Sequence, residues 1–163
     1  TVHPYQCAGV VARRLTILAP EDSPNTDGID PDSSQDVLIE DCYIATGDDS
    51  IAIKSGWDCA GVGKMPTRNV TVRRLTSHTV NSASVCIGSE MSAGVSGVEV
   101  HDCAFLGSAV GMRIKSSITR GGTVEGVHFH DNVVNGCGVA LELSDHYGGP
   151  NPVCAPVTRL PTV

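Results

Sequence analysis

The sequence is poor in aromatic residues, in helical periodicity and in basic charge. Aromatic side chains make up 4% of its 163 residues. Few apolar residues recur at helical spacing, so we expect few helices. No run of about 18 apolar residues occurs, so we expect no transmembrane helix and no membrane partner. The formal net charge of −7 argues against nucleic acid as a partner, although a local basic patch can still bind a polyanion.

The sequence instead contains many Val, Ile, Thr and Gly residues, arranged in a repeat. A strand-like segment recurs every 27 to 33 residues, beginning at Val10, Val37, Val70, Val98 and Val127. A second apolar segment follows about 14 residues later, at Ile51, Val85, Met112 and Leu141, and Ile29 takes that place in the first unit. Strand repeats of this length without helices predict a β-solenoid, here a parallel β-helix of about five coils. An antiparallel sandwich or barrel is the alternative, and the constant offset between the two strands of each unit disfavours it.

The repeat also sets the expected domain boundaries. Residues 1–145 are predicted to form the β-helix, and residues 146–163 an irregular, proline-rich tail. The excursion Trp57–Thr67 is predicted to leave the coils and form a groove wall. Neither end has the polar cap that a solenoid needs, and no signal peptide is recognisable. We therefore interpret the chain as a piece of a longer β-helix or an unusually short form.

Strand alternation predicts which side chains face the core. The expected inward residues are Ile51, Ile53, Val85, Ile87, Met112, Ile114, Leu141 and Leu143. The expected outward residues are Ala52, Lys54, Cys86, Gly88, Arg113, Lys115, Glu142, Asp30 and Asp32. Cys42 and Cys103 occupy equivalent places about 10 Å apart, with Leu75 between them, which is too far for a disulfide. We expect both to be small core residues.

Two acidic clusters precede equivalent strands. Asp27 lies two residues before Ile29, and Asp49 lies two residues before Ile51, with Asp48 beside it. Stacked coils would therefore bring three carboxylates together. Their mutual repulsion should raise at least one carboxyl pKa, which suits acid catalysis near neutral pH. The alternative is that these aspartates only cap turns before strands.

Basic residues are expected on the same outward face. Arg113 and Lys115 lie two coils further on, and Lys54 and Arg120 could extend the patch. Such a pair can bind a substrate carboxylate, and Arg can do so through two parallel hydrogen bonds. The alternative is a solvated strand face with an ion pair at its rim.

Three further patterns indicate no site of their own. His128 and His130 alternate on one strand, but no third ligand accompanies them, so surface histidines are favoured over a metal site. The aspartates of Asp27–Asp32 do not have the spacing of an EF-hand calcium loop. The turn at Gly88–Ser92 lacks the Lys and the following helix of a phosphate loop. We expect no metal.

The motifs NTDGID, GDDSIAIKSG, GSEMS and RIK, in this order, resemble those of glycoside hydrolase family 28, the polygalacturonases. The segment from Ser23 to Asp58 is especially similar to the plant polygalacturonase-like branch. The resemblance covers roughly residues 1–122. It implies a right-handed, single-stranded parallel β-helix that hydrolyses pectin with inversion and without a metal or other cofactor.

The resemblance also implies roles for individual residues. Asp48 would be the general acid, and Asp27 and Asp49 would activate the attacking water. An inverting pair is expected to lie about 6.5–9.5 Å apart, to admit that water. Arg113 and Lys115 would hold the galacturonate carboxylate. Substrate-binding roles are also expected for two further residues of the acidic stretch, Asn25 and Lys54.

The sequence departs from the family's pattern at two positions. Ala83 stands where many members have a His, and Ser50 stands where a Cys usually follows the Asp doublet. Three alternatives remain besides a polygalacturonase, and these departures favour the inactive one. They are a rhamnogalacturonan or xylogalacturonan hydrolase, an inactive β-helix that only binds pectic polysaccharide, and a calcium-dependent pectate lyase. The expected partner is pectic polysaccharide, the expected state is a monomer, and the resemblance implies an extracellular or cell-wall location.

Overall fold

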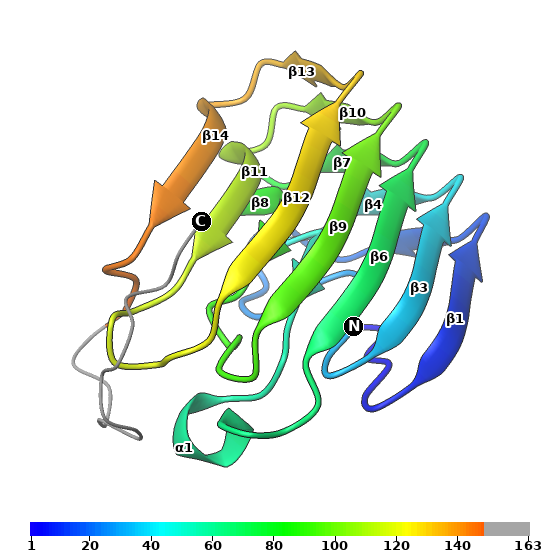
Figure 1. The fold of residues 1–163 in the computed structure, drawn as a ribbon. Helices are drawn as coiled ribbons and strands as arrows, with labels where there is room; N and C mark the ends of the chain where they lie inside the picture. Colours follow the sequence, from blue (N-terminus) through cyan, green and yellow to red (C-terminus); the bar gives the residue numbers. More distant parts are fainter. Residues whose placement is uncertain (149–163) are drawn as a thin grey trace.

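The structure, a computed structural model, describes residues 1–148 (Figure 1). These residues form a parallel β-helix whose coils contribute strands to three sheets. The first sheet contains β1 (Ala8–Arg13), β3 (Gln35–Glu40), β6 (Thr67–Arg73), β9 (Val95–His101) and β12 (Val124–His130). The second contains β2 (Thr16–Leu18), β4 (Tyr43–Ala45), β7 (Thr76–His78), β10 (Ala104–Leu106) and β13 (Val133–Asn135). The third contains β5 (Ile51–Ile53), β8 (Ala83–Ile87), β11 (Val110–Lys115) and β14 (Val139–Ser144).

Every strand pair in these sheets is parallel, and strands of the same sheet stack one coil above the next. This arrangement confirms the predicted parallel β-helix and its coils. In the first coil, Ile29 takes the place of the third-sheet strand, and it forms a parallel bridge with Ile51. The only α-helix among residues 1–148 is α1 (Asp58–Gly61), within the predicted excursion. No helix in this part of the chain is long and apolar enough to span a membrane.

The prediction of two strands per unit was wrong, because the coils that begin at β3, β6, β9 and β12 have three strands each. The segment that begins at Val37 was read as one strand, but β3 ends at Glu40 and β4 begins at Tyr43. Asp41, between them, has a φ of 55°. Equivalent turns have φ values of 55° at Arg14, 51° at Arg74, 54° at Asp102 and 52° at Asp131. One left-handed residue per coil therefore turns the chain from the first sheet into the second.

Stacked side-chain columns fill the interior. In the third sheet, the inward residues Ile53, Ile87, Ile114 and Leu143 follow one another in register. Ile53 and Ile87 are fully buried, whereas Leu143 is 54% exposed because no described strand stacks beyond β14. Cys42 and Cys103 are buried free thiols, as predicted.

The outward positions Ala52 and Cys86 are fully buried, which alternation alone did not predict. Cys86 lies among charged groups, since Asp49, Lys115 and Arg113 all act on its thiol. Burial raises the pKa of Cys86 well above its ordinary value. The outer face of the third sheet is therefore covered by other side chains at this place, where the acidic cluster lies.

Candidate active site

The first two coils place the acidic clusters side by side. The Gly28 N–H donates to the Asp49 carbonyl (3.0 Å), and the Ile29 N–H donates to the Ser50 carbonyl (3.0 Å). A Cβ atom on Gly28 would lie 2.3 Å from the Ser50 carbonyl oxygen, so only glycine permits this approach. The close contact fixes Asp27 next to Asp49 across one coil.

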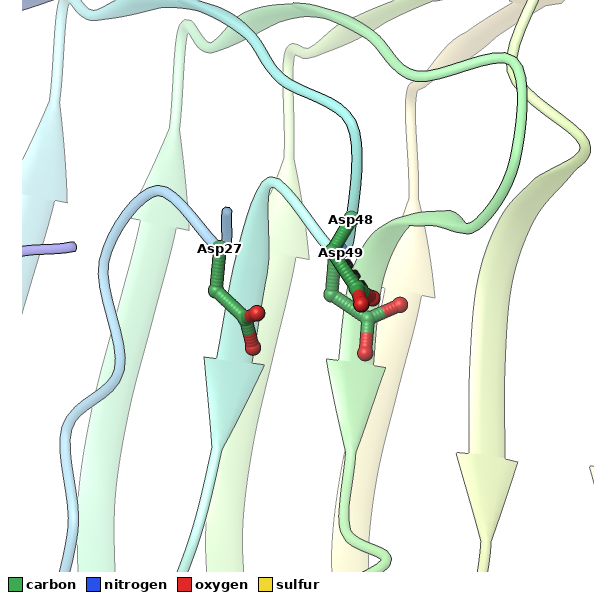
Figure 2. Close-up of side chains that lie close together, drawn as sticks. All are labelled: Asp27, Asp48 and Asp49. Carbon is green, nitrogen blue, oxygen red and sulfur yellow. Dashed lines mark hydrogen bonds between the residues drawn. The ribbon is translucent and has the colours of Figure 1, made fainter. Parts of the chain in front are cut away.

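The three carboxylates meet as predicted (Figure 2). One oxygen from each of Asp27, Asp48 and Asp49 lies within 4.8 Å of the other two. This spacing is shorter than the 6.5–9.5 Å or so that we expected between acid and base. Asp48 and Asp49 are consecutive residues, and Asp27 lies in the adjacent coil, only one strand spacing (about 4.8 Å) away. The trio borders a cavity of about 400 Å³.

Asp49 is the most tightly held of the three. The Ser82 hydroxyl (2.5 Å) and the Ala83 backbone N–H (2.9 Å) both donate to its Oδ1. The Lys115 ammonium donates to its Oδ2 (2.8 Å). The side chain of Asp49 is only 3% exposed, and that of Lys115 only 7%. Asp48 is less buried, and its Oδ1 accepts the Asp49 backbone N–H (2.8 Å).

Asp27 belongs to a second charged group, together with Asp30, Lys54 and Glu90. The Lys54 ammonium lies 2.9 Å from Asp30, 3.5 Å from Asp27 and 3.6 Å from Glu90. Burial raises the pKa of Asp27. The positive charge of Lys54 opposes this rise, and the negative charges of Asp48 and Asp49 add to it. Burial and the charge of Asp27 raise the pKa of Asp30 to about 7, which Lys54 again opposes. A carboxyl pKa is therefore raised at Asp27, but burial contributes more to this rise than the repulsion from Asp48 and Asp49 that we predicted.

The predicted substrate-binding residues fall into two sets. Asn25, Lys54 and Lys115 line the cavity with the acidic trio. Arg113 is not part of that lining, and its guanidinium donates twice to Glu142 Oε2 (3.1 and 3.0 Å). Arg120 donates to Ser89 (2.7 Å) and pairs with Asp58 (3.1 Å), which ties the turn at Ser89 to α1.

Sequence reasoning missed several residues of the site, among them Ser82, Asp30 and Tyr147. Ser82 directly precedes β8 and donates to Asp49. Asp30 was assigned to an outer face but is 4% exposed, and its Oδ1 is buried without a hydrogen-bond partner. Tyr147 lies in the predicted tail, yet it lines the cavity, with the Lys115 ammonium 4.6 Å from its ring centroid. The short run of aspartates around Asp30 was the one sequence signal that could have identified any of these residues.

Asp27, Asp48 and Asp49 are also the one group of metal-ligating side chains with such close spacing within residues 1–148. Two lysines already supply positive charge there, Lys115 at Asp49 and Lys54 at Asp27. The Asp27–Asp32 run does not converge on one point, since Asp32 accepts the Gly56 N–H (2.9 Å) instead.

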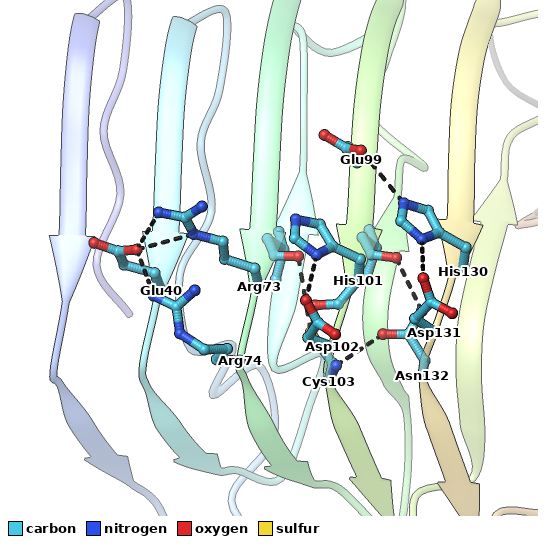
Figure 3. A network of polar contacts seen from close by, with 12 residues as sticks. Glu40, Arg73, Arg74, Glu99, His101, Asp102, Cys103, His130, Asp131 and Asn132 are labelled. Atoms are coloured by element: carbon cyan, nitrogen blue, oxygen red, sulfur yellow. Dashed lines mark hydrogen bonds and ion pairs between the residues drawn. The ribbon is translucent and has the colours of Figure 1, made fainter.

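His128 and His130 of β12 are both exposed, and His130 lies in a polar network on the first sheet with Glu99, His101 and Asp131 (Figure 3). His130 is exposed and stacks on His101, with ring centroids 5.3 Å apart. Hydrogen bonds with Asp131 and Glu99 raise the pKa of His130. These contacts agree with the predicted surface role of this strand.

Comparisons with known proteins agree with the motifs and the fold. Residues 1–162 match glycosyl hydrolases family 28. A probable polygalacturonase of Vitis vinifera is 43% identical over 148 residues, which are 90% of this chain and 30% of that protein. A polygalacturonase structure from Erwinia carotovora ssp. carotovora superposes with a TM-score of 0.83 at 34% identity, over 92% of this chain and 38% of that chain.

An exopolygalacturonase structure from Thermotoga maritima gives a TM-score of 0.81 at 36% identity, over 87% of this chain and 33% of that chain. The chain thus spans about a third of the length of these relatives. The match over nearly every residue, the ordered motifs and the parallel β-helix together show that the chain belongs to glycoside hydrolase family 28.

Proposed function

We propose that the chain carries the catalytic centre of an inverting glycoside hydrolase that cleaves α-1,4-galacturonosyl linkages of pectin. The observation that carries this proposal is the gathering of Asp27, Asp48 and Asp49 within 4.8 Å, beside a cavity that Lys115 also lines. Carboxylates in different surroundings can divide acid and base roles between them. A cation beside them suits a substrate that bears a carboxylate on every sugar.

In this proposal Asp48 protonates the leaving glycosidic oxygen. It is the least buried of the doublet and faces the cavity, so it can reach a bound sugar. Asp27 and Asp49 orient and deprotonate the attacking water between them. A covalent intermediate on Asp49 is disfavoured, because its oxygens already accept hydrogen bonds from Ser82, Ala83 and Lys115.

Substrate binding rests on the basic and polar lining. Lys115 approaches the galacturonate carboxylate from beside Asp49, and Arg113, from the same face of β11, supports it after partial release from Glu142. Asn25 and Lys54 contact the sugar next to the cleavage point. The proposed location is extracellular or in the cell wall, and the proposed state is a monomer.

A second candidate function is pectin binding without hydrolysis. It is favoured by Ala83, whose side chain cannot take part in proton transfer. A hydrolase of rhamnogalacturonan or xylogalacturonan would use the same residues with a different groove.

The test is release of reducing ends from polygalacturonic acid, without added calcium, by the chain and its Asp48→Asn variant. Asp22→Asn is the matched control, since Asp22 is exposed and does not line the cavity. We expect activity that falls by at least about 100-fold in Asp48→Asn, as for loss of a general acid, and that persists in Asp22→Asn. Unsaturated products absorbing in the ultraviolet would indicate a lyase. A folded wild-type chain that binds but does not cleave would favour the binding function.

A further inference from the structure

The hydroxyl group of Ser82 makes the shortest contact to Asp49. Its Oγ lies 2.5 Å from Asp49 Oδ1, within the range of hydrogen bonds from a hydroxyl to a charged oxygen. Ser82 is 6% exposed and Asp49 is 2% exposed, so water has little access to compete for this bond. A bond this short in a dry environment is a strong restraint on the acceptor.

The backbone of Ser82 is itself fixed on both sides. Its carbonyl accepts the Val110 N–H (3.1 Å) from β11, and the next residue, Ala83, donates its own N–H to the same Asp49 oxygen. The side chain of Asn81, one residue earlier, donates to the Glu21 carbonyl (2.7 Å). The hydroxyl is therefore presented from a rigid turn at the start of β8.

The donors around Asp49 are divided between its two oxygens. Ser82 and Ala83 hold Oδ1, and Lys115 holds Oδ2. Rotation of the carboxylate about its Cβ–Cγ bond would break bonds on both sides. Ala83 stands where many family members have a histidine, and it contributes only its backbone.

We propose that Ser82 is a positioning residue that fixes the Asp49 carboxylate in the orientation in which it acts, with Asp27, on the attacking water. This inference rests on the proposed function for its catalytic consequence. Its structural content, a hydroxyl that donates to Asp49, can be tested without any activity.

The kinetic test compares Ser82→Ala with Ser84→Ala. Ser84 is the matched control, because it is a buried serine of the same segment whose hydroxyl is bonded to Ser108 (2.8 Å) rather than to Asp49. Loss of one hydrogen bond to a charged group corresponds to about a 10- to 100-fold fall in kcat. We expect that fall in Ser82→Ala with KM within about twofold of wild type, because Ser82 is not placed in contact with the sugar.

The dependence of kcat on pH supplies a second kinetic readout. The charged or titratable groups around the Asp49 carboxylate are Lys115 from β11, Cys86 from β8, and Asp48 and Asp27 beside it. None of these is altered by the substitution. We expect the acidic limb of the profile to move to higher pH in Ser82→Ala and to stay in place in Ser84→Ala, because an ionised carboxylate that loses a donor is less stabilised.

Proton NMR tests the bond itself. A hydroxyl proton in so short and buried a hydrogen bond should resonate far downfield and exchange slowly with water. We expect this signal in the wild type and in Ser84→Ala, and its loss in Ser82→Ala. A folded wild-type chain without such a signal would overturn the inference, as would a Ser82→Ala variant with the kcat and pH profile of Ser84→Ala. If the wild type is inactive but the signal is present, the proposed function fails while the Ser82–Asp49 bond stands.

Discussion

Asp27, Asp48 and Asp49 are one residue type in three different environments. Asp49 is buried and accepts hydrogen bonds from three donors, whereas Asp48 accepts a backbone N–H and is more exposed. Asp27 shares its charge environment with Asp30 and Lys54. These differences, rather than residue type, support the division into one acid and two water-activating groups.

Substitutions of Asp49 and Lys115 should have strongly non-additive effects on the free energy of unfolding. Lys115→Met leaves Asp49 buried without its cation, and removing one partner of a buried pair costs about 3–5 kcal/mol. The double variant Asp49→Asn/Lys115→Met should lose less than the sum of the two single variants, because neither charge is then left unpaired. Urea unfolding of the wild type, the two single variants and the double variant measures this coupling. Additive losses would show that the ion pair is not a stabilising contact.

Asp30 should make stability depend on pH. Its pKa is about 7 in the folded chain and about 3.9 in the unfolded chain. Between these values the folded state keeps a proton that the unfolded state has lost, so stability falls as the pH rises from about 4 to about 7. Asp30→Asn removes this penalty.

The free energy of unfolding of Asp30→Asn, relative to wild type, should therefore increase across that pH range by on the order of a few kcal/mol. Urea unfolding at several pH values measures the difference, and Asp22→Asn serves as the exposed control. A difference that stays constant from pH 4 to pH 7 would contradict the assignment of a protonated Asp30.

At the scale of secondary structure, the side-chain columns differ in burial along the β-helix. Shortening an apolar side chain should therefore destabilise a central coil more than the last coil. Ile87 and Leu143 occupy the same column of the third sheet, but Ile87 is fully buried and Leu143 is 54% exposed. Ile87→Ala should cost about 2–5 kcal/mol, and Leu143→Ala about 1 kcal/mol or less. Thermal or urea unfolding compares them. Equal losses would mean that Leu143 is buried in solution.

Much of this architecture could be predicted from spacing, because each coil repeats the same pattern of apolar residues. The positions of Asp27 and Asp49 before Ile29 and Ile51 were enough to align the two acidic clusters. The second-sheet strand of each coil was missed, because the apolar pattern continues through the turn at Asp41 and a left-handed φ leaves little trace in the sequence.

The remaining site residues depend on side-chain direction in irregular segments. Ser82 reaches Asp49 from a turn, and Tyr147 reaches the cavity from beyond the last strand. Strand alternation does not describe either segment. The burial of Asp30 depends on neighbours from another coil, Lys54 among them, and no local pattern reports such contacts.

At the scale of the whole molecule, negative charge surrounds a site proposed to bind a polyanion. The chain carries a net charge of −7, so attraction of galacturonan must come from local cations. Lys115 and Lys54 are the cations that line the acidic cavity. Both are paired with carboxylates, so substrate binding has to exchange one set of ionic contacts for another rather than add new ones.

Two features of the acidic site bear on the stereochemistry of the proposed reaction. The nearest oxygens of the three carboxylates lie within 4.8 Å of one another, and so short a spacing, taken alone, favours retention. The hydrogen bonds to both oxygens of Asp49 argue for a bound water as the nucleophile instead. These two arguments predict opposite configurations for the first product.

The decisive measurement is therefore time-resolved proton NMR of the anomeric signals during hydrolysis of a galacturonate oligomer, recorded before mutarotation. We expect the new reducing end to appear first as the β-anomer, which is inversion of the α-linkage by water held between Asp27 and Asp49. First appearance of the α-anomer would show retention through a covalent intermediate and contradict the roles proposed for the three aspartates.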